Sequence, residues 1–214
     1  AGMQVAMKDL EIRGAGNLLG GEQSGHIEGV GFDLYVRLVG EAVAELRDGG
    51  GPVEVPPMKI ELPVDAHLPH EYIPGERLRL EAYRKLAQAE ADEQVEEIVA
   101  ELTDRYGPLP EVVTNLVEVA RFRVLARRAG LSEVTVQGNF VRLAPVELRE
   151  SQMLRLKRVY PGSLVKPAVR TVLVPAPKQA RIGGKPVRDS EVLQWASRLV
   201  RAVLLGETEA EAAG

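Results

Sequence analysis

Residues 133–143 read EVTVQGNFVRL, in which two short runs of β-branched and apolar residues flank Gly138 and Asn139. Such runs around a glycine-asparagine pair are typical of a β-hairpin, because both residues tolerate a tight turn. Residues 170–174, RTVLV, predict a further strand. Residues 58–64 alternate between apolar and polar side chains until a proline intervenes, which predicts another strand near an edge. The sequence therefore predicts a small sheet.

Helical periodicity surrounds these strands. Helices are predicted over residues 32–47, 75–90, 92–106, 110–129 and 146–159, with a last helix that begins near Ser190. We expect Asp92 to be the N-cap of the helix 92–106 and Gly107 to end it. Because helices and strands are mixed without strict alternation, we predict an α+β fold with a small mixed, largely antiparallel sheet flanked by several helices.

Four of these helices carry an apolar stripe that predicts a buried face. The stripe of the helix 32–47 consists of Tyr35, Leu38, Val39, Ala42 and Leu46. The stripe of the helix 92–106 consists of Val95, Ile98, Val99, Leu102 and Tyr106. The stripe of the helix 110–129 consists of Val113, Leu116, Val117, Ala120 and Val124. The last helix contributes Val192, Leu193, Ala196, Leu199, Val200 and Val203. Trp195 is expected at the margin of this core.

Composition indicates a globular chain. The 214 residues are 45% hydrophobic and include no cysteine, which excludes disulfides and thiolate metal sites. No apolar run approaches the roughly 20 residues that span a bilayer, and no signal peptide is recognisable. We therefore expect a cytoplasmic protein without membrane contact. The chain begins on Ala1 rather than Met, and we expect it to be a piece of a longer protein.

Charge is unevenly distributed along the chain. Residues 1–109 carry 10 Lys and Arg against 21 Asp and Glu, whereas residues 110–214 carry 17 against 10. This asymmetry predicts an acidic and a basic face with different neighbours, although two ordinary solvated surfaces would give the same count.

A linker divides the chain. Residues 48–57 read DGGGPVEVPP, a glycine- and proline-rich stretch that favours a domain boundary. We therefore predict a loop and helix over residues 1–47, a domain over 58–205 and a polar tail over 206–214.

Residues 9–25, DLEIRGAGNLLGGEQSG, contain five glycines, and such loops often bind phosphates. The sequence has no G-x-x-x-x-G-K-[ST] string, and the dinucleotide pattern G-x-G-x-x-G that starts at Gly14 fails at Leu19. A tight loop without nucleotide chemistry is the simpler interpretation.

This stretch, extended to DLEIRGAGNLLGGEQSGHIEGVGFDLY, resembles the translocation motif of the bacterial transcription-repair coupling factors, the Mfd family. RecG translocases share a shorter version. The segments LPHEYIPGERLRLEAYRKLAQAE and EEIVAELTDRYGPLPE resemble the C-terminal domain of the coupling factors, which RecG lacks. The chain is thus identified as a C-terminal fragment of this family. The resemblance spans nearly the whole chain and weakens beyond about residue 130.

The resemblance implies a motor outside this chain. The full-length parent would be an ATP-dependent duplex-DNA translocase that binds ATP and Mg²⁺, removes stalled RNA polymerase and recruits excision repair. This fragment would hold no cofactor and would have no ATPase activity. Its translocation-motif residues would couple ATP hydrolysis to movement: Arg13, Gly14, Gly16, Gly20, Gln23 and Gly25. Gly21 departs from the acidic residue that is common at this position of the family.

The resemblance also implies a regulatory role for residues 58–205. In the family this domain packs on the protein's own N-terminal UvrA-recruiting module and masks it from UvrA. The match at ELTDRYG carries Glu101, Asp104 and Arg105 over as contacts to that module. Glu93 and Glu97 would lie on the same helix face, and an acidic face of this kind is more often merely solvated.

The basic half supports a rival hypothesis, a free-standing basic DNA-binding module. Arg155, Lys157 and Arg158, joined by Lys166 and Arg170, are candidate phosphate contacts. A second candidate group lies on the helix 110–129 and consists of Arg121, Arg123, Arg127 and Arg128. Aromatic residues make up only 4% of the chain, so base stacking is not expected. A third interpretation is a scaffold domain with a different partner.

Two histidines, His67 and His70, flank Leu-Pro in a predicted loop. Without a third ligand nearby, they are expected to be surface or packing residues rather than metal ligands.

Overall fold

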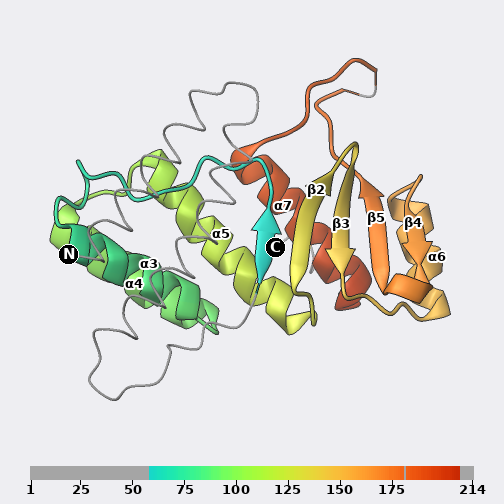
Figure 1. Ribbon diagram of the computed structural model, residues 1–214, viewed down its shortest axis with the longest axis horizontal. Helices are drawn as coiled ribbons and strands as arrows, with labels where there is room; N and C mark the ends of the chain where they lie inside the picture. Colours follow the sequence, from blue (N-terminus) through green and yellow to red (C-terminus); the bar gives the residue numbers. More distant parts are fainter. Residues whose placement is uncertain (1–57, 181, 208–214) are drawn as a thin grey trace. The chain divides into compact units, whose positions relative to one another are not determined.

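The structure, a computed structural model, describes residues 58–180 and 182–207 (Figure 1). Four predicted features lie outside the described residues: the translocation motif, the helix 32–47, the linker 48–57 and most of the tail, residues 208–214. The described part of the chain forms two compact units. The first comprises Pro63–Val124, and the second combines Met58–Leu62 with the residues from Leu125 onward.

The first unit is helical. It contains α3 (Glu76–Gln88), α4 (Asp92–Tyr106) and most of α5 (Glu111–Arg128), in agreement with the predicted positions to within two residues. Helices α3 and α4 pack against each other (Figure 1). In α4 the side chains of Val95, Ile98 and Leu102 are buried as predicted, while Val99 and Tyr106 are half-buried.

Helix α5 is buried on more faces than its stripe predicts. All five stripe residues are buried, and so are Asn115, Val119, Phe122 and Arg123, which point in other directions around the helix. A helix that is buried nearly all round shows little amphipathic contrast, which explains why the sequence reveals only one face.

The start of α4 differs from the prediction. Asp92 is the first helical residue, and the extended Ala91 precedes it without a side-chain cap. Asp92 and Glu93 instead place negative charge in the first turn, where the positive end of the helix dipole favours it.

An extended segment follows the first strand and is fixed by hydrogen bonds. Side chains 62, 64, 66 and 68 are buried in alternation. The backbone N–H of Leu68 donates to the Tyr83 hydroxyl (2.8 Å), and Asn115 Nδ2 donates to the carbonyl oxygen of Asp65 (2.9 Å). The alternation of buried and less buried side chains therefore continues beyond the strand. Side chains, rather than a neighbouring strand, provide hydrogen-bond partners for the backbone there.

The second unit contains a five-stranded sheet with the order β1-β2-β3-β5-β4. The strands are β1 (Lys59–Glu61), β2 (Glu133–Gln137), β3 (Phe140–Ala144), β4 (Leu164–Lys166) and β5 (Thr171–Pro175). Only the β1–β2 pair is parallel, whereas the other three pairs are antiparallel. The predicted α+β fold with a mixed, largely antiparallel sheet is therefore confirmed. Strand β1 is shorter than predicted and ends before Pro63, which has no N–H to donate.

The predicted hairpin is present. Gln137 pairs with Phe140 and Val136 with Val141, so that Gly138 and Asn139 form the turn. Gly138 has a φ of +60°, a conformation that glycine adopts without steric cost.

The second unit differs from the prediction in one predicted helix and in two elements that were not predicted. The helix predicted over 146–159 begins only at Glu150 as α6 (Glu150–Val159), because the N–H of Val146 donates to the carbonyl of Arg170 in extended conformation. Strand β4 and the following 3₁₀ turn η1 (Pro167–Val169) were not predicted. With three residues each, they are too short for a recognisable alternating pattern.

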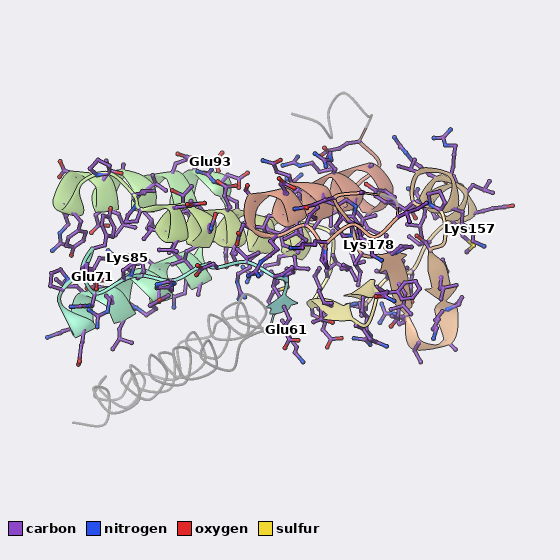
Figure 2. All side chains as sticks on the ribbon, turned by 90° about the horizontal axis from the view of Figure 1, so that it is seen from above. Glu61, Glu71, Lys85, Glu93, Lys157 and Lys178 are labelled. Atoms are coloured by element: carbon purple, nitrogen blue, oxygen red, sulfur yellow. The ribbon has the colours of Figure 1, made fainter. Side chains whose placement is uncertain are left out.

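Helix α7 (Asp189–Leu199) continues into a π-helical turn, η2 (Val200–Leu204). All six residues of its predicted stripe are buried. Helices α6 and α7 lie on the same side of the sheet (Figure 2). Trp195 is half-buried and meets the ring of Tyr160 edge-on at 6.0 Å, which confirms its predicted place at the core margin.

Candidate protein-interaction site

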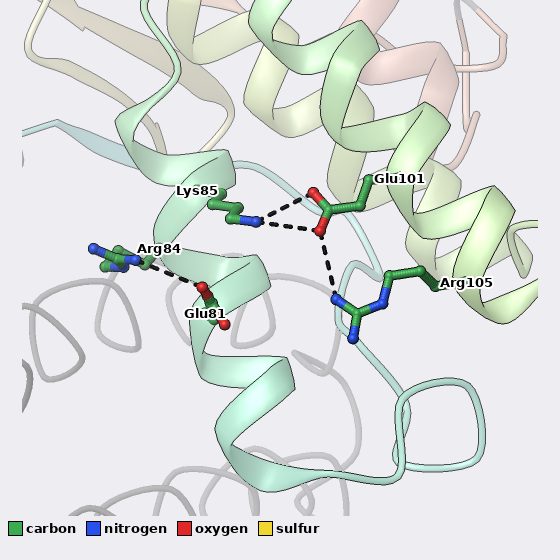
Figure 3. A network of polar contacts seen from close by, with 5 residues as sticks. All are labelled: Glu81, Arg84, Lys85, Glu101 and Arg105. Carbon is green, nitrogen blue, oxygen red and sulfur yellow. Dashed lines mark hydrogen bonds and ion pairs between the residues drawn. The ribbon is translucent and has the colours of Figure 1, made fainter.

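The C-terminal half of α4 carries a charged network with α3 (Figure 3). Lys85 Nζ lies 3.1 Å and 3.3 Å from the two carboxylate oxygens of Glu101. Arg105 Nη1 lies 3.5 Å from the same carboxylate, one helical turn further along α4. Glu101 therefore bridges α3 and α4. Since all three side chains are partly exposed, each ion pair contributes about 1 kcal/mol or less to stability.

Aromatic rings fix the end of α4. The hydroxyl of Tyr72 donates to the carbonyl oxygens of Gly107 (2.8 Å) and Leu102 (3.2 Å). The rings of Tyr72 and Tyr106 lie 5.7 Å apart, and the Arg105 guanidinium lies 5.4 Å from the Tyr106 ring centre. Burial, and after it the proximity of Tyr106, raises the pKa of Tyr72, which keeps its hydroxyl protonated as a donor.

A shallow hollow of about 20 Å³, roughly the space of one water molecule, lies within this network. Leu78, Ala82, Ile98 and Leu102 form its apolar floor, and the charged side chains of the network surround it. The hollow is too small for a metabolite-sized ligand. The arrangement suits recognition of a protein surface.

The three residues carried over as interface contacts lie in one turn of α4, but their environments differ. Asp104 and Arg105 are exposed, whereas Glu101 is half-buried and engaged by Lys85. Asp104 forms no ion pair within the described ranges. Glu93 and Glu97 are exposed nearer the start of the helix, and Figure 2 shows Glu93 pointing away from the fold.

Sequence reasoning missed Lys85. It lies on a different helix, 16 residues before its partner Glu101, and no local pattern relates two residues across a helix pair. Its place near the end of the helix predicted over 75–90 was the only available indication.

The second unit carries the predicted basic cluster on α6. Lys157 and Arg158 are exposed and Arg155 is half-buried. Figure 2 shows Lys157 pointing outward. Of the two residues grouped with them, Lys166 is exposed, but Arg170 pairs with Glu147 at 3.0 Å.

The second predicted basic group, on α5, is not a surface patch. Arg123 is only 2% exposed, and Arg121 forms ion pairs with Glu96 and Glu118. Burial lowers the pKa of Arg121, but the hydrogen bond to Glu96 and the neighbouring carboxylates outweigh it and raise the pKa overall. Because Arg123 is buried and Arg121 is paired, the prediction that the four α5 arginines together contact phosphates is wrong, although Arg128 is exposed.

Metal ligands do not gather in the described ranges, where no three His, Cys, Asp or Glu side chains lie close enough to hold an ion. His67 Nδ1 lies 3.3 Å from Asp65, and His70 Nδ1 lies 3.2 Å from Glu71. Among the helices between residues 58 and 207, none combines the length and apolar character that crossing a membrane requires.

Comparison with known proteins gives a consistent result. A family model described as the TRCF domain matches residues 62–155. The transcription-repair-coupling factor of Mycobacterium tuberculosis is 51% identical over 95% of this chain, and that of Staphylococcus aureus is 42% identical over 66%. The chain spans 17% and 12% of the length of these two relatives.

A solved structure agrees at the level of the fold. The crystal structure of the C-terminal domain of a transcription-repair coupling factor matches 71% of this chain and 96% of its own, with a TM-score of 0.52 and 18% identity. The sequence matches and the shared fold lead to one conclusion: the chain belongs to the transcription-repair coupling factor family.

Proposed function

We propose that this chain is the C-terminal part of an ATP-dependent duplex-DNA translocase that removes stalled RNA polymerase and recruits excision repair in the cytoplasm. Residues 1–47 would help couple ATP hydrolysis to movement through Arg13 and Gln23. ATP and Mg²⁺ would be bound by the motor in other parts of the full-length protein. The identity to coupling factors over 95% of the chain supports this assignment.

For residues 58–205 we propose an autoinhibitory role, in which the end of α4 covers the protein's own UvrA-recruiting module. The observation that carries this proposal is the set of contacts that hold the helix turn with Asp104 and Arg105. The Tyr72 hydroxyl fixes the backbone at the end of the helix, and Glu101 ties the same turn to Lys85. An anchored helix turn favours docking, because little backbone freedom is lost on binding.

This arrangement refines the roles of the three carried-over residues. Asp104 and Arg105 would contact the recruiting module directly. Glu101, whose carboxylate is already engaged by Lys85, would mainly orient Arg105.

The proposal can be tested by calorimetric titration of the 214-residue chain with the separately produced UvrA-recruiting module at two salt concentrations. Asp104→Ala combined with Arg105→Ala is expected to weaken binding by at least about tenfold. Glu93→Ala combined with Glu97→Ala is the matched control, since it also removes two exposed charges from α4, and it should bind nearly as tightly as the parent. Equal losses in both variants would contradict the assigned contacts, and absence of binding would contradict the masking role.

A further inference from the structure

The part of the second unit formed by α6, β4 and η1 is unusually apolar for an exposed surface. The exposed large apolar side chains of the described residues are Leu154, Val159, Leu164, Val169 and Ile182. Four of these five lie between residues 154 and 169, and Leu154 is 66% exposed. Of these four, Leu154 is the most exposed, and it is the one that lines a groove of this unit.

The same region is strongly basic. Residues 151–188 include nine Lys and Arg and no Asp or Glu. Across the described ranges, Arg155, Lys157 and Arg158 take part in no ion pair. The Nε atom of Arg155 is buried and lacks a hydrogen-bond partner among the described residues. Arg170 pairs with Glu147, but the positive charges of the three α6 side chains are not neutralised by the described part of the chain.

A groove of about 410 Å³ brings the apolar and basic side chains together. One wall is the face of α6 that carries Ser151, Leu154, Arg155 and Arg158, which follow the i, i+3, i+4, i+7 spacing of one helix face. Ala202, Val203 and Gly206, at the end of η2, form the other wall.

A single glutamine holds the two walls in place. Gln152 Oε1 accepts a hydrogen bond from the backbone N–H of Arg149 at 2.8 Å. Its Nε2 donates to the carbonyl oxygen of Val203 at 3.1 Å. The side chain therefore spans from the start of α6 to η2 and fixes the width of the groove.

We propose that this groove binds an acidic amphipathic helix of a partner protein. An apolar side chain of that helix would pack against Leu154, and its carboxylates would pair with Arg155 and Arg158. Helix-in-groove recognition of this kind needs an apolar floor and flanking charges of opposite sign, and both are present. A nucleic-acid backbone would use the arginines but leave Leu154 exposed, and the lining includes no aromatic side chain for base stacking.

The test measures fluorescence anisotropy of labelled probes with the full 214-residue chain. One probe is a synthetic helical peptide of glutamates with leucines at helical spacing, the second has serine in place of each leucine, and the third is a short duplex DNA. The leucine peptide is expected to bind at least about tenfold tighter than the serine peptide. Leu154→Ser should abolish this difference, whereas Ile182→Ser, at a side chain that is 94% exposed elsewhere in the unit, should preserve it.

Charge reversal tests the second half of the proposal. Arg155→Glu combined with Arg158→Glu should weaken binding of the leucine peptide at least about tenfold, while Lys178→Glu combined with Lys185→Glu should not. Equal affinity for both peptides would overturn the proposal, because attraction would then be purely electrostatic. Binding of duplex DNA without binding of the leucine peptide would also overturn it, in favour of phosphate recognition.

Discussion

At the scale of single residues, Tyr72 connects the packing of the first unit to its candidate site. Its hydroxyl donates to the carbonyl oxygen of Gly107, just past the last turn of α4, and to that of Leu102 within the helix. One phenol thus ties the end of α4, next to the turn with Asp104 and Arg105, to the segment that precedes α3.

Replacement of Tyr72 by Phe removes these two hydrogen bonds and retains the ring. We expect the free energy of unfolding to fall by about 1 kcal/mol, measured by urea denaturation. Tyr106→Phe is the matched control, because the Tyr106 hydroxyl makes no hydrogen bond with the described residues. A loss as large in the control as in Tyr72→Phe would contradict this role.

The same phenol predicts a response to alkaline pH. Burial raises the pKa of Tyr72 and that of Tyr160, the latter against an opposing effect of Arg198. In the unfolded chain a tyrosine ionises at about pH 10. Because the folded pKa is higher, the stabilisation is complete below about pH 10 and is lost as the pH rises further, through the folded pKa.

Urea denaturation of the parent chain between about pH 8 and pH 11 should therefore show a falling free energy of unfolding at the alkaline end. Tyr72→Phe combined with Tyr160→Phe should make that decline shallower. An unchanged decline in the double variant would refute the assignment to these two tyrosines.

Residue-scale contacts could be predicted only in part. Asp104 and Arg105 are exposed on α4, as expected of contacts carried over from ELTDRYG. The pairing of Glu101 with Lys85 and the capping of α4 by Tyr72 join residues 16 to 35 positions apart. Such contacts depend on how helices pack, so periodicity within one helix contains no information about them.

At the scale of elements, α4 depends on its final glycine. Gly107 has φ and ψ values of 88° and −168°, a backbone region that is essentially restricted to glycine. Its N–H donates to the carbonyl oxygen of Thr103 at 2.9 Å and closes the last turn.

Gly107→Ala should destabilise the chain by about 1–3 kcal/mol through backbone strain alone, because an added Cβ would meet no atom within 4 Å. The readout is the midpoint of thermal or urea unfolding. Gly75→Ala offers the same substitution at an ordinary φ of −81°, where only the Leu78 side chain must shift, and should cost less. Equal costs at both positions would show that strain at Gly107 is not the cause.

Helices and strands with a clear periodicity of apolar residues were predictable from the sequence, and elements without one were not. The hairpin β2–β3, the helices α3, α4 and α5, and the stripe of α7 follow from alternation or helical spacing. Strand β4 did not, because its three residues obtain their conformation from pairing with β5 rather than from their own pattern. The start of α6 was also misplaced, since long-range pairing of Val146 with Arg170 overrides local helical preference.

At the scale of the whole molecule, the order of the sheet determines which strands are protected. Strands β2, β3 and β5 each pair on both sides, whereas β1 and β4 are edges with three residues each. Hydrogen exchange of the full chain should therefore be slowest in β3 and its neighbours and clearly faster in β4, because edge amides open without global unfolding. Equal protection of β3 and β4 would contradict this ranking.

The division into two units was not predictable from the sequence. The linker at 48–57 lies outside the described residues, and the boundary at Val124 falls inside the continuous helix α5. A linker can be recognised from its glycine- and proline-rich composition. A boundary within a helix has no such signal, because the composition of the helix does not change there.

The short strand β1 has a mechanical consequence. It is the first described element after residues 1–57, which include the predicted translocation motif, and it is held by a ladder of only three residue pairs with β2. Tension applied to the chain ahead of Met58 would load this ladder before any other described element. We therefore expect β1 to detach first under force. The remaining four strands of the sheet would stay paired.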